Sequence, residues 1–237
     1  MTRELTTAER TLMEADSTHA IIFDLDGVLF DTSGAHERAY ADVWRVANVT
    51  GVPYVQLAGR RTQDVLREVL VGTSEQYRQQ LVEFKQSQAR AYLETTDTPA
   101  PGAEQLLLAL RQRGRALGLV TGGSRRGALQ LLERGQIVHF FHVIVTADDV
   151  ARGKPDPAGF SRALQELRVP AKRALVVEDS HSGILSALSA GTWVASVHSG
   201  QSVSHARFCG AFPTLRALHL WMKDNFEQAS LPIVRLS

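Results

Sequence analysis

The sequence has few of the features that mark secreted, membrane or disulfide-stabilised proteins. Its 237 residues include one cysteine, Cys209, so no internal disulfide can form, and nothing around this thiol suggests an activated one. The longest apolar runs, such as LLLAL at 106–110, are far shorter than the roughly 20 residues that span a bilayer. Acidic residues interrupt the segment where a signal peptide needs an apolar stretch: Glu4, Glu9, Glu14 and Asp16. We therefore expect a reduced, soluble, cytoplasmic protein without a membrane partner.

The sequence also lacks a clear excess of basic over acidic residues, or of acidic over basic ones. Lysine and arginine together number 26 and the acids 25, which gives a formal net charge of +1. No concentrated basic tract is present, so the electrostatic footprint of a nucleic-acid-binding protein is lacking and no nucleic-acid partner is expected. The hydrophobic content of 44% suffices for one core and a smaller lobe.

Short apolar segments alternate with longer segments of helical period. The predicted strands are 20–23 (AIIF), 116–120 (ALGLV), 141–145 (FHVIV), 174–178 (ALVVE) and 193–197 (WVASV). The predicted helices include 102–114, 124–135 and 157–169, of which the first two end at a glycine. This alternation is typical of an α/β protein whose parallel sheet is covered by helices on both faces.

The first predicted strand is followed by a long segment that lacks a strand pattern. Residues 33–97 have helical patterning, and TDTPAPG at 96–102 is rich in proline and turn formers. We therefore predict two domains: an α/β core made of residues 1–32 and 98–237, and an inserted α-helical domain made of residues 33–97.

Polar side chains follow the predicted strands at the points where the strands end. These side chains are Asp24 and Asp26, then Thr121, then Lys154, then Glu178 and Asp179. Ligand sites in parallel sheets lie outside the carboxyl ends of the strands, so these groups are expected to meet at one edge. Carboxylate oxygens suit Mg²⁺, and a lysine and a hydroxyl beside them suit phosphoryl oxygens.

Four motifs carry a resemblance to a known family. FDLDGVLFDT, LVTGGS, GKPDP and VVEDSHSGI, in this order and spacing, resemble the motifs of the haloacid dehalogenase superfamily of phosphotransferases. The helical insertion resembles the small cap of its β-phosphoglucomutase and phosphoglycolate phosphatase branch. The resemblance extends from about Ile21 to Phe212. It implies a Rossmann-like parallel-sheet core with an inserted α-helical cap.

The resemblance also implies roles for the strand-end residues. Asp24 matches the nucleophile that forms an aspartyl-phosphate, and Asp26 matches the general acid and base. Thr121 and Lys154 match the groups that hold the phosphoryl group. The implied cofactor is Mg²⁺, with Asp24, the backbone carbonyl of Asp26, Asp179 and Glu178 as its ligands or supports. Dehalogenating members lack the second aspartate, so Asp26 favours phosphoryl transfer.

Further residues are candidates for contact with phosphate or substrate. Gly27 and Gly122 would let backbone amides approach the phosphate. In the cap, His36, Arg60, Arg61 and Lys85 match or lie near positions that reach the substrate in this branch. Solvated surface charge is the alternative interpretation of Arg60, Arg61 and Lys85.

Two other patterns resemble a nucleotide site and a metal site but do not fit them. Lys154 follows a glycine, but Asp148 and Pro155 occupy positions that a nucleotide P-loop requires to be Gly and Ser or Thr. The HFFH segment at 139–142 enters a predicted strand, and its phenylalanines fit a core better than a metal site.

The sequence thus predicts a Mg²⁺-dependent phosphatase acting on a small phosphorylated metabolite, such as a sugar phosphate, through an aspartyl-phosphate. A phosphosugar mutase of the β-phosphoglucomutase type is the alternative, because it shares the first half-reaction. A non-catalytic binding protein on the same scaffold is a remote alternative. The identity of the substrate and the oligomeric state are not predicted.

Overall fold

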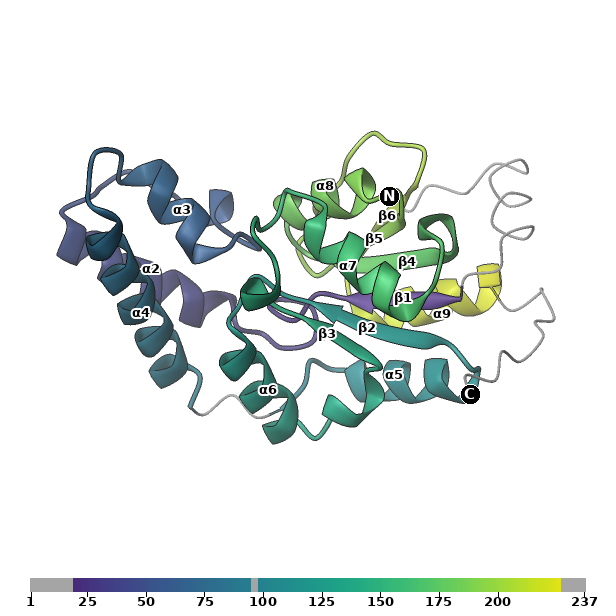
Figure 1. The fold of residues 1–237 in the computed structure, drawn as a ribbon. Helices are drawn as coiled ribbons and strands as arrows, with labels where there is room; N and C mark the ends of the chain where they lie inside the picture. The colour runs from purple at the N-terminus through teal and green to yellow at the C-terminus, as the bar shows by residue number, and fades with distance from the viewer. Residues whose placement is uncertain (1–18, 95–97, 227–237) are drawn as a thin grey trace.

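The computed structural model describes residues 19–94 and 98–226, which form an α/β core and a helical cap (Figure 1). The core contains one six-stranded sheet of order β3-β2-β1-β4-β5-β6, and every neighbouring pair is parallel. The central strand β1 (Ala20–Phe23) places Ile21 between Leu117 and Leu175 of its two neighbours. The predicted α/β class with a helical cap is confirmed.

The other strands follow the predicted positions with two differences. They are β2 (Ala116–Val120), β3 (Val143–Val145), β4 (Ala174–Glu178), β5 (Trp193–Val197) and β6 (Phe208–Phe212). Strand β3 begins two residues later than predicted because a 3₁₀ turn, η2 (Val138–Phe140), precedes it. Strand β6 was not predicted, since FCGAF has no β-branched residue and contains Gly210.

Helices cover both faces of the sheet because the strand side chains alternate between them. Ile21 and Phe23 pack with α5 (Ala103–Gln112), α6 (Arg125–Arg134) and α9 (Leu215–Phe226). Ala20 and Ile22 pack on the opposite face with α7 (Ala158–Leu167) and α8 (His181–Ser189). Burying each large apolar side chain contributes about 1.5–3 kcal/mol, so the two layers fix the strand ends in place.

The cap has a hydrophobic core of its own. It consists of α2 (Ser33–Ala47), the 3₁₀ turn η1 (Tyr54–Gln56), α3 (Thr62–Val69) and α4 (Glu75–Tyr92). Tyr40 stacks on Trp44 with ring centroids 5.6 Å apart, and Leu66 and Leu81 are buried beside them. The predicted start of the cap, residue 33, is the first residue of α2; residues 95–97, at its predicted end, lie outside the described residues.

Two more 3₁₀ turns, η3 (Ala147–Asp149) and η4 (Ala171–Arg173), complete the core.

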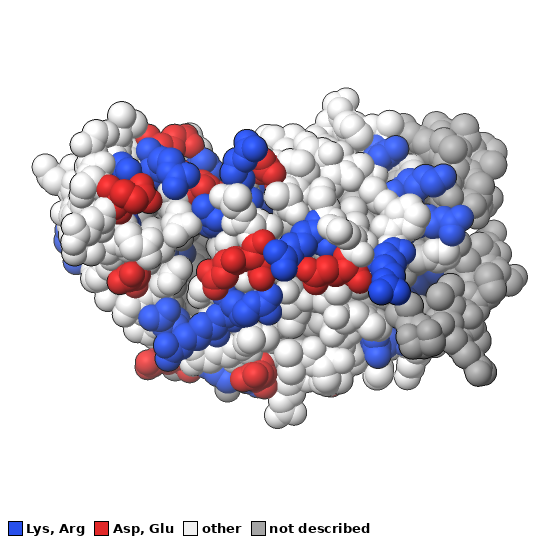
Figure 2. Space-filling model, in the orientation of Figure 1, with Lys and Arg blue, Asp and Glu red and all other residues white. Residues whose placement is uncertain are grey.

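Figure 2 shows basic and acidic side chains interleaved along the junction between the cap and the core. Across 19–94 and 98–226, helices that are both long and apolar enough to cross a membrane are absent.

Candidate active site

The ends of β1 and β4 meet at a buried lysine. The Nζ atom of Lys154 lies 2.5 Å from Asp24 Oδ1 and 2.5 Å from Glu178 Oε1, and it donates to the Val120 carbonyl at 3.2 Å. Burial alone would lower the pKa of Lys154, but the two carboxylates hold it above its ordinary value. The site therefore keeps a fixed positive charge directly against Asp24.

Glu178 uses both carboxylate oxygens to organise this edge. Its Oε2 accepts from the N–H groups of Asp179 and Ser180, at 3.1 and 3.2 Å, and from the Ser180 hydroxyl at 3.0 Å. Gly183 makes room for it, since a Cβ there would lie 1.9 Å from Glu178 Oε1. With both oxygens engaged by protein donors, Glu178 is placed to position Lys154 and the loop after β4.

Asp24 and Asp179 leave carboxylate oxygens for a cation. Asp24 Oδ2 is buried and has no hydrogen-bond partner, and ligand atoms of Asp24, Glu178 and Asp179 lie within 4.8 Å of one another. Burial and the neighbouring carboxylates raise the pKa of Asp24 well above its ordinary value. Burial and Glu178 raise that of Asp179 to about 8. A buried oxygen without a partner among crowded carboxylates fits a hard divalent ion such as Mg²⁺.

Gly27 makes room for this cluster in a way that differs from the sequence interpretation. Its φ of +77° favours glycine, and a Cβ would lie 2.1 Å from Asp179 Oδ2. The Gly27 N–H already donates to the Phe30 carbonyl at 2.8 Å. This amide is thus engaged within the loop, and the absence of a side chain serves the placement of Asp179.

Asp26 accepts hydrogen bonds from three side chains. Thr32 and His36 bond to its Oδ1, at 2.8 and 3.0 Å, and the Thr121 hydroxyl donates to its Oδ2 at 3.1 Å. Burial would raise the pKa of Asp26, but His36 and Thr32 together lower it below its ordinary value. Thr32 was not singled out from the sequence, although it belongs to the first motif.

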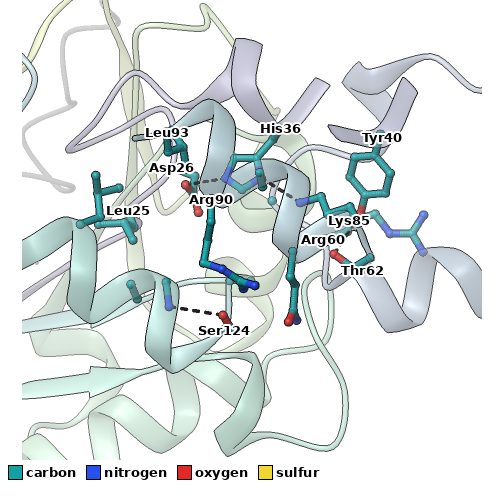
Figure 3. A pocket seen from close by; sticks show the side chains of 18 of the residues that line it. Leu25, Asp26, His36, Tyr40, Arg60, Thr62, Lys85, Arg90, Leu93 and Ser124 are labelled. Atoms are coloured by element: carbon teal, nitrogen blue, oxygen red, sulfur yellow. Dashed lines mark hydrogen bonds and ion pairs between the residues drawn. The ribbon is translucent and has the colours of Figure 1, made fainter. Parts of the chain in front are cut away.

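The cap reaches Asp26 through His36 and Lys85. Since a carboxylate only accepts, His36 donates from Nε2, and its Nδ1 then accepts from Lys85 Nζ at 2.8 Å. Burial lowers the pKa of Lys85 to about 8, although Asp26 opposes this shift. The predicted residues His36 and Lys85 are thereby brought together with Asp26 in one chain of hydrogen bonds (Figure 3).

The loop before α3 lies directly on the strand ends. The Ser182 hydroxyl, on α8, donates to the Ala58 carbonyl at 2.7 Å. A Cβ on Gly122 would lie 2.9 Å from the Gly59 carbonyl oxygen. Gly122 therefore allows the cap to approach the site closely, a reason the sequence did not reveal.

The two arginines of this loop point in different directions. Arg61 donates to the Val150 carbonyl at 2.6 Å, so its guanidinium links the cap to a core loop, and the residue does not line the cavity. Arg60 lines the cavity, but its guanidinium pairs with Glu68 at 2.5 Å. The structure thus brings Arg60, and not Arg61, to the predicted substrate space.

A cavity of about 980 Å³, measured out to its open mouth, lies between the cap and the core. Asp24, Asp26 and Gly122 line one end of it. Tyr54 and Arg90 are among the lining residues that the sequence did not indicate, because a lone tyrosine and a helical arginine carry no motif. Figure 3 shows Arg90 extending from α4 into this space.

Known proteins resemble this chain over most of its length. A family model described as "Haloacid dehalogenase-like hydrolase" matches residues 21–197. Validoxylamine A 7'-phosphate phosphatase of Streptomyces hygroscopicus subsp. limoneus is 34% identical over 193 residues, which cover 78% of this chain and 89% of that protein. Beta-phosphoglucomutase of Bacillus subtilis (strain 168) is 31% identical over 195 residues, covering 77% and 84%.

Solved structures extend the agreement to the fold. A crystal structure of beta-phosphoglucomutase from Clostridium difficile matches with a TM-score of 0.78 at 22% identity, and the match covers 89% of this chain and 97% of that one. Because the family model spans all four motifs and the carboxylates of the first and last meet at Lys154, the protein belongs to the haloacid dehalogenase-like hydrolase family.

Proposed function

We propose that this protein is a Mg²⁺-dependent phosphatase that hydrolyses a small phosphorylated metabolite through an aspartyl-phosphate on Asp24. The observation that carries the proposal is the pairing of two aspartates with opposite environments at one strand end. Asp24 accepts a hydrogen bond from the Lys154 ammonium and keeps one oxygen without a partner. Asp26 instead accepts hydrogen bonds from the hydroxyls of Thr32 and Thr121 and from His36 of the cap. Asp24 is thus placed to bond to phosphorus, and Asp26 is placed to exchange a proton with the leaving oxygen and with water.

In the first step, an oxygen of Asp24 bonds to phosphorus while the bond from phosphorus to the ester oxygen breaks. Because His36 and Thr32 lower the pKa of Asp26 in the free protein, Asp26 takes up a proton as the substrate binds, and it gives this proton to the leaving oxygen. Lys154 offsets the negative charge that gathers on the phosphoryl oxygens. Mg²⁺, when held by Asp24 and Asp179, supplies further charge neutralisation at the phosphoryl group.

In the second step, Asp26 takes a proton from water, and the resulting oxygen bonds to phosphorus while the bond to Asp24 breaks. Thr32, His36 and Thr121 orient the Asp26 carboxylate for this transfer. The cap loop over the strand ends limits which acceptor can reach the phosphoenzyme.

A phosphosugar mutase is the second candidate, since a relative with 31% identity carries that name. A mutase returns the phosphoryl group to another hydroxyl of the sugar, and the same residues serve its first step. We favour hydrolysis because water is the smallest acceptor that a closed cap admits.

The deciding experiment incubates the protein and Mg²⁺ with a panel of sugar phosphates, with and without a sugar bisphosphate activator, and measures both free phosphate and isomerised sugar phosphate. We expect free phosphate with Mg²⁺ and none with EDTA. Conversion to a positional isomer with little free phosphate, dependent on the bisphosphate, would assign the protein as a mutase. Inert behaviour of the folded protein towards the whole panel would favour a non-catalytic binding protein.

A further inference from the structure

The cavity continues beyond the catalytic residues into an arm between α4 of the cap and α6 of the core. Helix α4 contributes Gln86, Ala89 and Arg90 to its wall, and α6 contributes Gly127 and Gln130 from the facing side. Gly127 has no side chain, and only Ser124 Oγ lies within 4 Å of where a Cβ would stand. The arm therefore has space for a part of the substrate that lies away from the phosphate.

Arg90 differs from the other cations that line the cavity. Lys85 donates to His36, Arg60 pairs with Glu68, and Arg134 donates to the Glu94 carbonyl. Arg90 is half-buried, and no hydrogen bond or ion pair joins its guanidinium to any residue of 19–94 or 98–226. A partly buried guanidinium with five donors and no acceptor is suited to bind one from a ligand.

The charge of the cavity is divided between its two ends. Among the described lining residues the carboxylates are Asp24 and Asp26, and both stand at the strand ends. The arm contains Arg90 and Arg134 and no acidic side chain from those ranges. A negatively charged group in the arm would therefore be attracted by the two arginines and repelled by none of the arm's described lining side chains.

The positions of Lys85 and Arg90 on α4 set the distance between Arg90 and the catalytic end of the cavity. Arg90 follows Lys85 by five residues, which corresponds to about 7.5 Å along a helix axis. Lys85 belongs to the hydrogen-bonded chain that ends on Asp26. A substrate group bound by Arg90 would thus lie several carbon atoms away from the phosphoryl group that reacts.

We propose that Arg90 determines specificity by binding a second acidic group of the substrate, a carboxylate or a phosphate, at the far end of a phosphorylated carbon chain. The proposal rests on the proposed function, which defines the other end as the phosphoryl site. It narrows the substrate class from phosphomonoesters in general to those that carry a distal negative charge.

The test measures binding rather than turnover. In the inactive Asp24→Asn background with Mg²⁺, calorimetry compares 6-phosphogluconate with glucitol 6-phosphate, which share a phosphorylated six-carbon chain and differ in a terminal carboxylate or hydroxymethyl group. We expect the carboxylate to strengthen binding by about 10-fold or more, and Arg90→Ala to remove that preference. The same measurement compares fructose 1,6-bisphosphate with fructose 6-phosphate, and tighter binding of the bisphosphate would show that the distal group is a phosphate rather than a carboxylate.

Control variants separate a specific contact from a general effect. Arg126→Ala removes an exposed arginine of α6 that does not line the cavity, so it should leave the preference intact. Arg90→Gln keeps a polar but shorter and uncharged side chain, and it serves if Arg90→Ala does not fold. Equal binding within both ligand pairs, undetectable binding of all four ligands, or a preference that persists without Arg90 would overturn the proposal. Failure of the wild type to release phosphate, with the preference present, would overturn the proposed function alone.

Discussion

Lys154 is charged in surroundings where burial alone would favour loss of its proton. Two carboxylates within 2.5 Å reverse that preference, and one of them, Glu178, is itself held by backbone and hydroxyl donors. Removing one partner of such a buried pair leaves an uncompensated charge. The reactivity of Asp24 therefore depends on Glu178, which need not touch the substrate at all.

Lys85 gives the site a pH dependence that can be measured. Its pKa of about 8 means that it carries a proton below that pH and loses it above, with His36, Asp26 and the Tyr40 ring as its neighbours. Since kcat/KM reports the free enzyme, we expect kcat/KM to fall as the pH rises through about 8.

The variant Lys85→Arg tests the assignment, because a guanidinium stays protonated to about pH 12. The alkaline decline in kcat/KM should then disappear or move to much higher pH, even if the overall rate is lower. A decline that stays near pH 8 in this variant would contradict the assignment to Lys85.

The sequence could predict the residues that follow strands, and it could not predict those that the cap brings in. Asp24, Lys154 and Asp179 were predictable because the carboxyl ends of parallel strands meet at one edge. Tyr54 and Arg90 face the cavity only because of how the cap packs on the core. The direction of Arg61, towards the Val150 carbonyl, depends on the same packing.

The contact between the cap loop and the end of β2 determines how closely the cap can approach the core over the active site. Gly122→Ala would place a methyl group 2.9 Å from the Gly59 carbonyl oxygen, so the loop must move away. We expect kcat to fall by about 10-fold because water exclusion and alignment suffer, while the melting temperature changes little.

A matched variant, Gly34→Ala on α2, places its methyl group in open space, with nothing within 4 Å. It should keep the wild-type kcat and gain up to about 1 kcal/mol of stability, since alanine favours helices. Wild-type kcat in Gly122→Ala would show that this contact does not control closure.

The strands illustrate how far local pattern determines an element. Five apolar runs predicted five strands, whereas β6 depends on pairing with β5 at the sheet edge rather than on its own composition. Edge pairing is a tertiary effect, and a strand containing Gly210 has little intrinsic preference for extended structure.

At the scale of the whole molecule, the metal site joins β1 to β4, so cation binding should stabilise the folded protein. We expect Mg²⁺ at about 100 times its dissociation constant to add ~2.7 kcal/mol, or about 5–10 °C in melting temperature, and EDTA to remove the gain. Asp179→Asn should abolish the Mg²⁺ effect and raise the melting temperature of the metal-free protein, because it removes the cost of burying a carboxylate and its repulsion with Glu178.

The exposed residue Asp31 offers the control, since it belongs to the first motif but lies outside the carboxylate cluster. Asp31→Asn should keep the full Mg²⁺ response. A melting temperature that ignores Mg²⁺ in the wild type would exclude Asp24 and Asp179 as a metal site.

Peptide mapping after rapid acid quench during turnover shows directly whether the phosphoryl group passes through Asp24. We expect a phosphoryl group on Asp24 in the wild type, and in Asp24→Asn no phosphorylated peptide and a rate lower by about 1000-fold or more. Turnover without a phosphorylated Asp24 peptide, together with an Asp24→Asn variant that keeps about a tenth of the wild-type rate, would contradict this expectation.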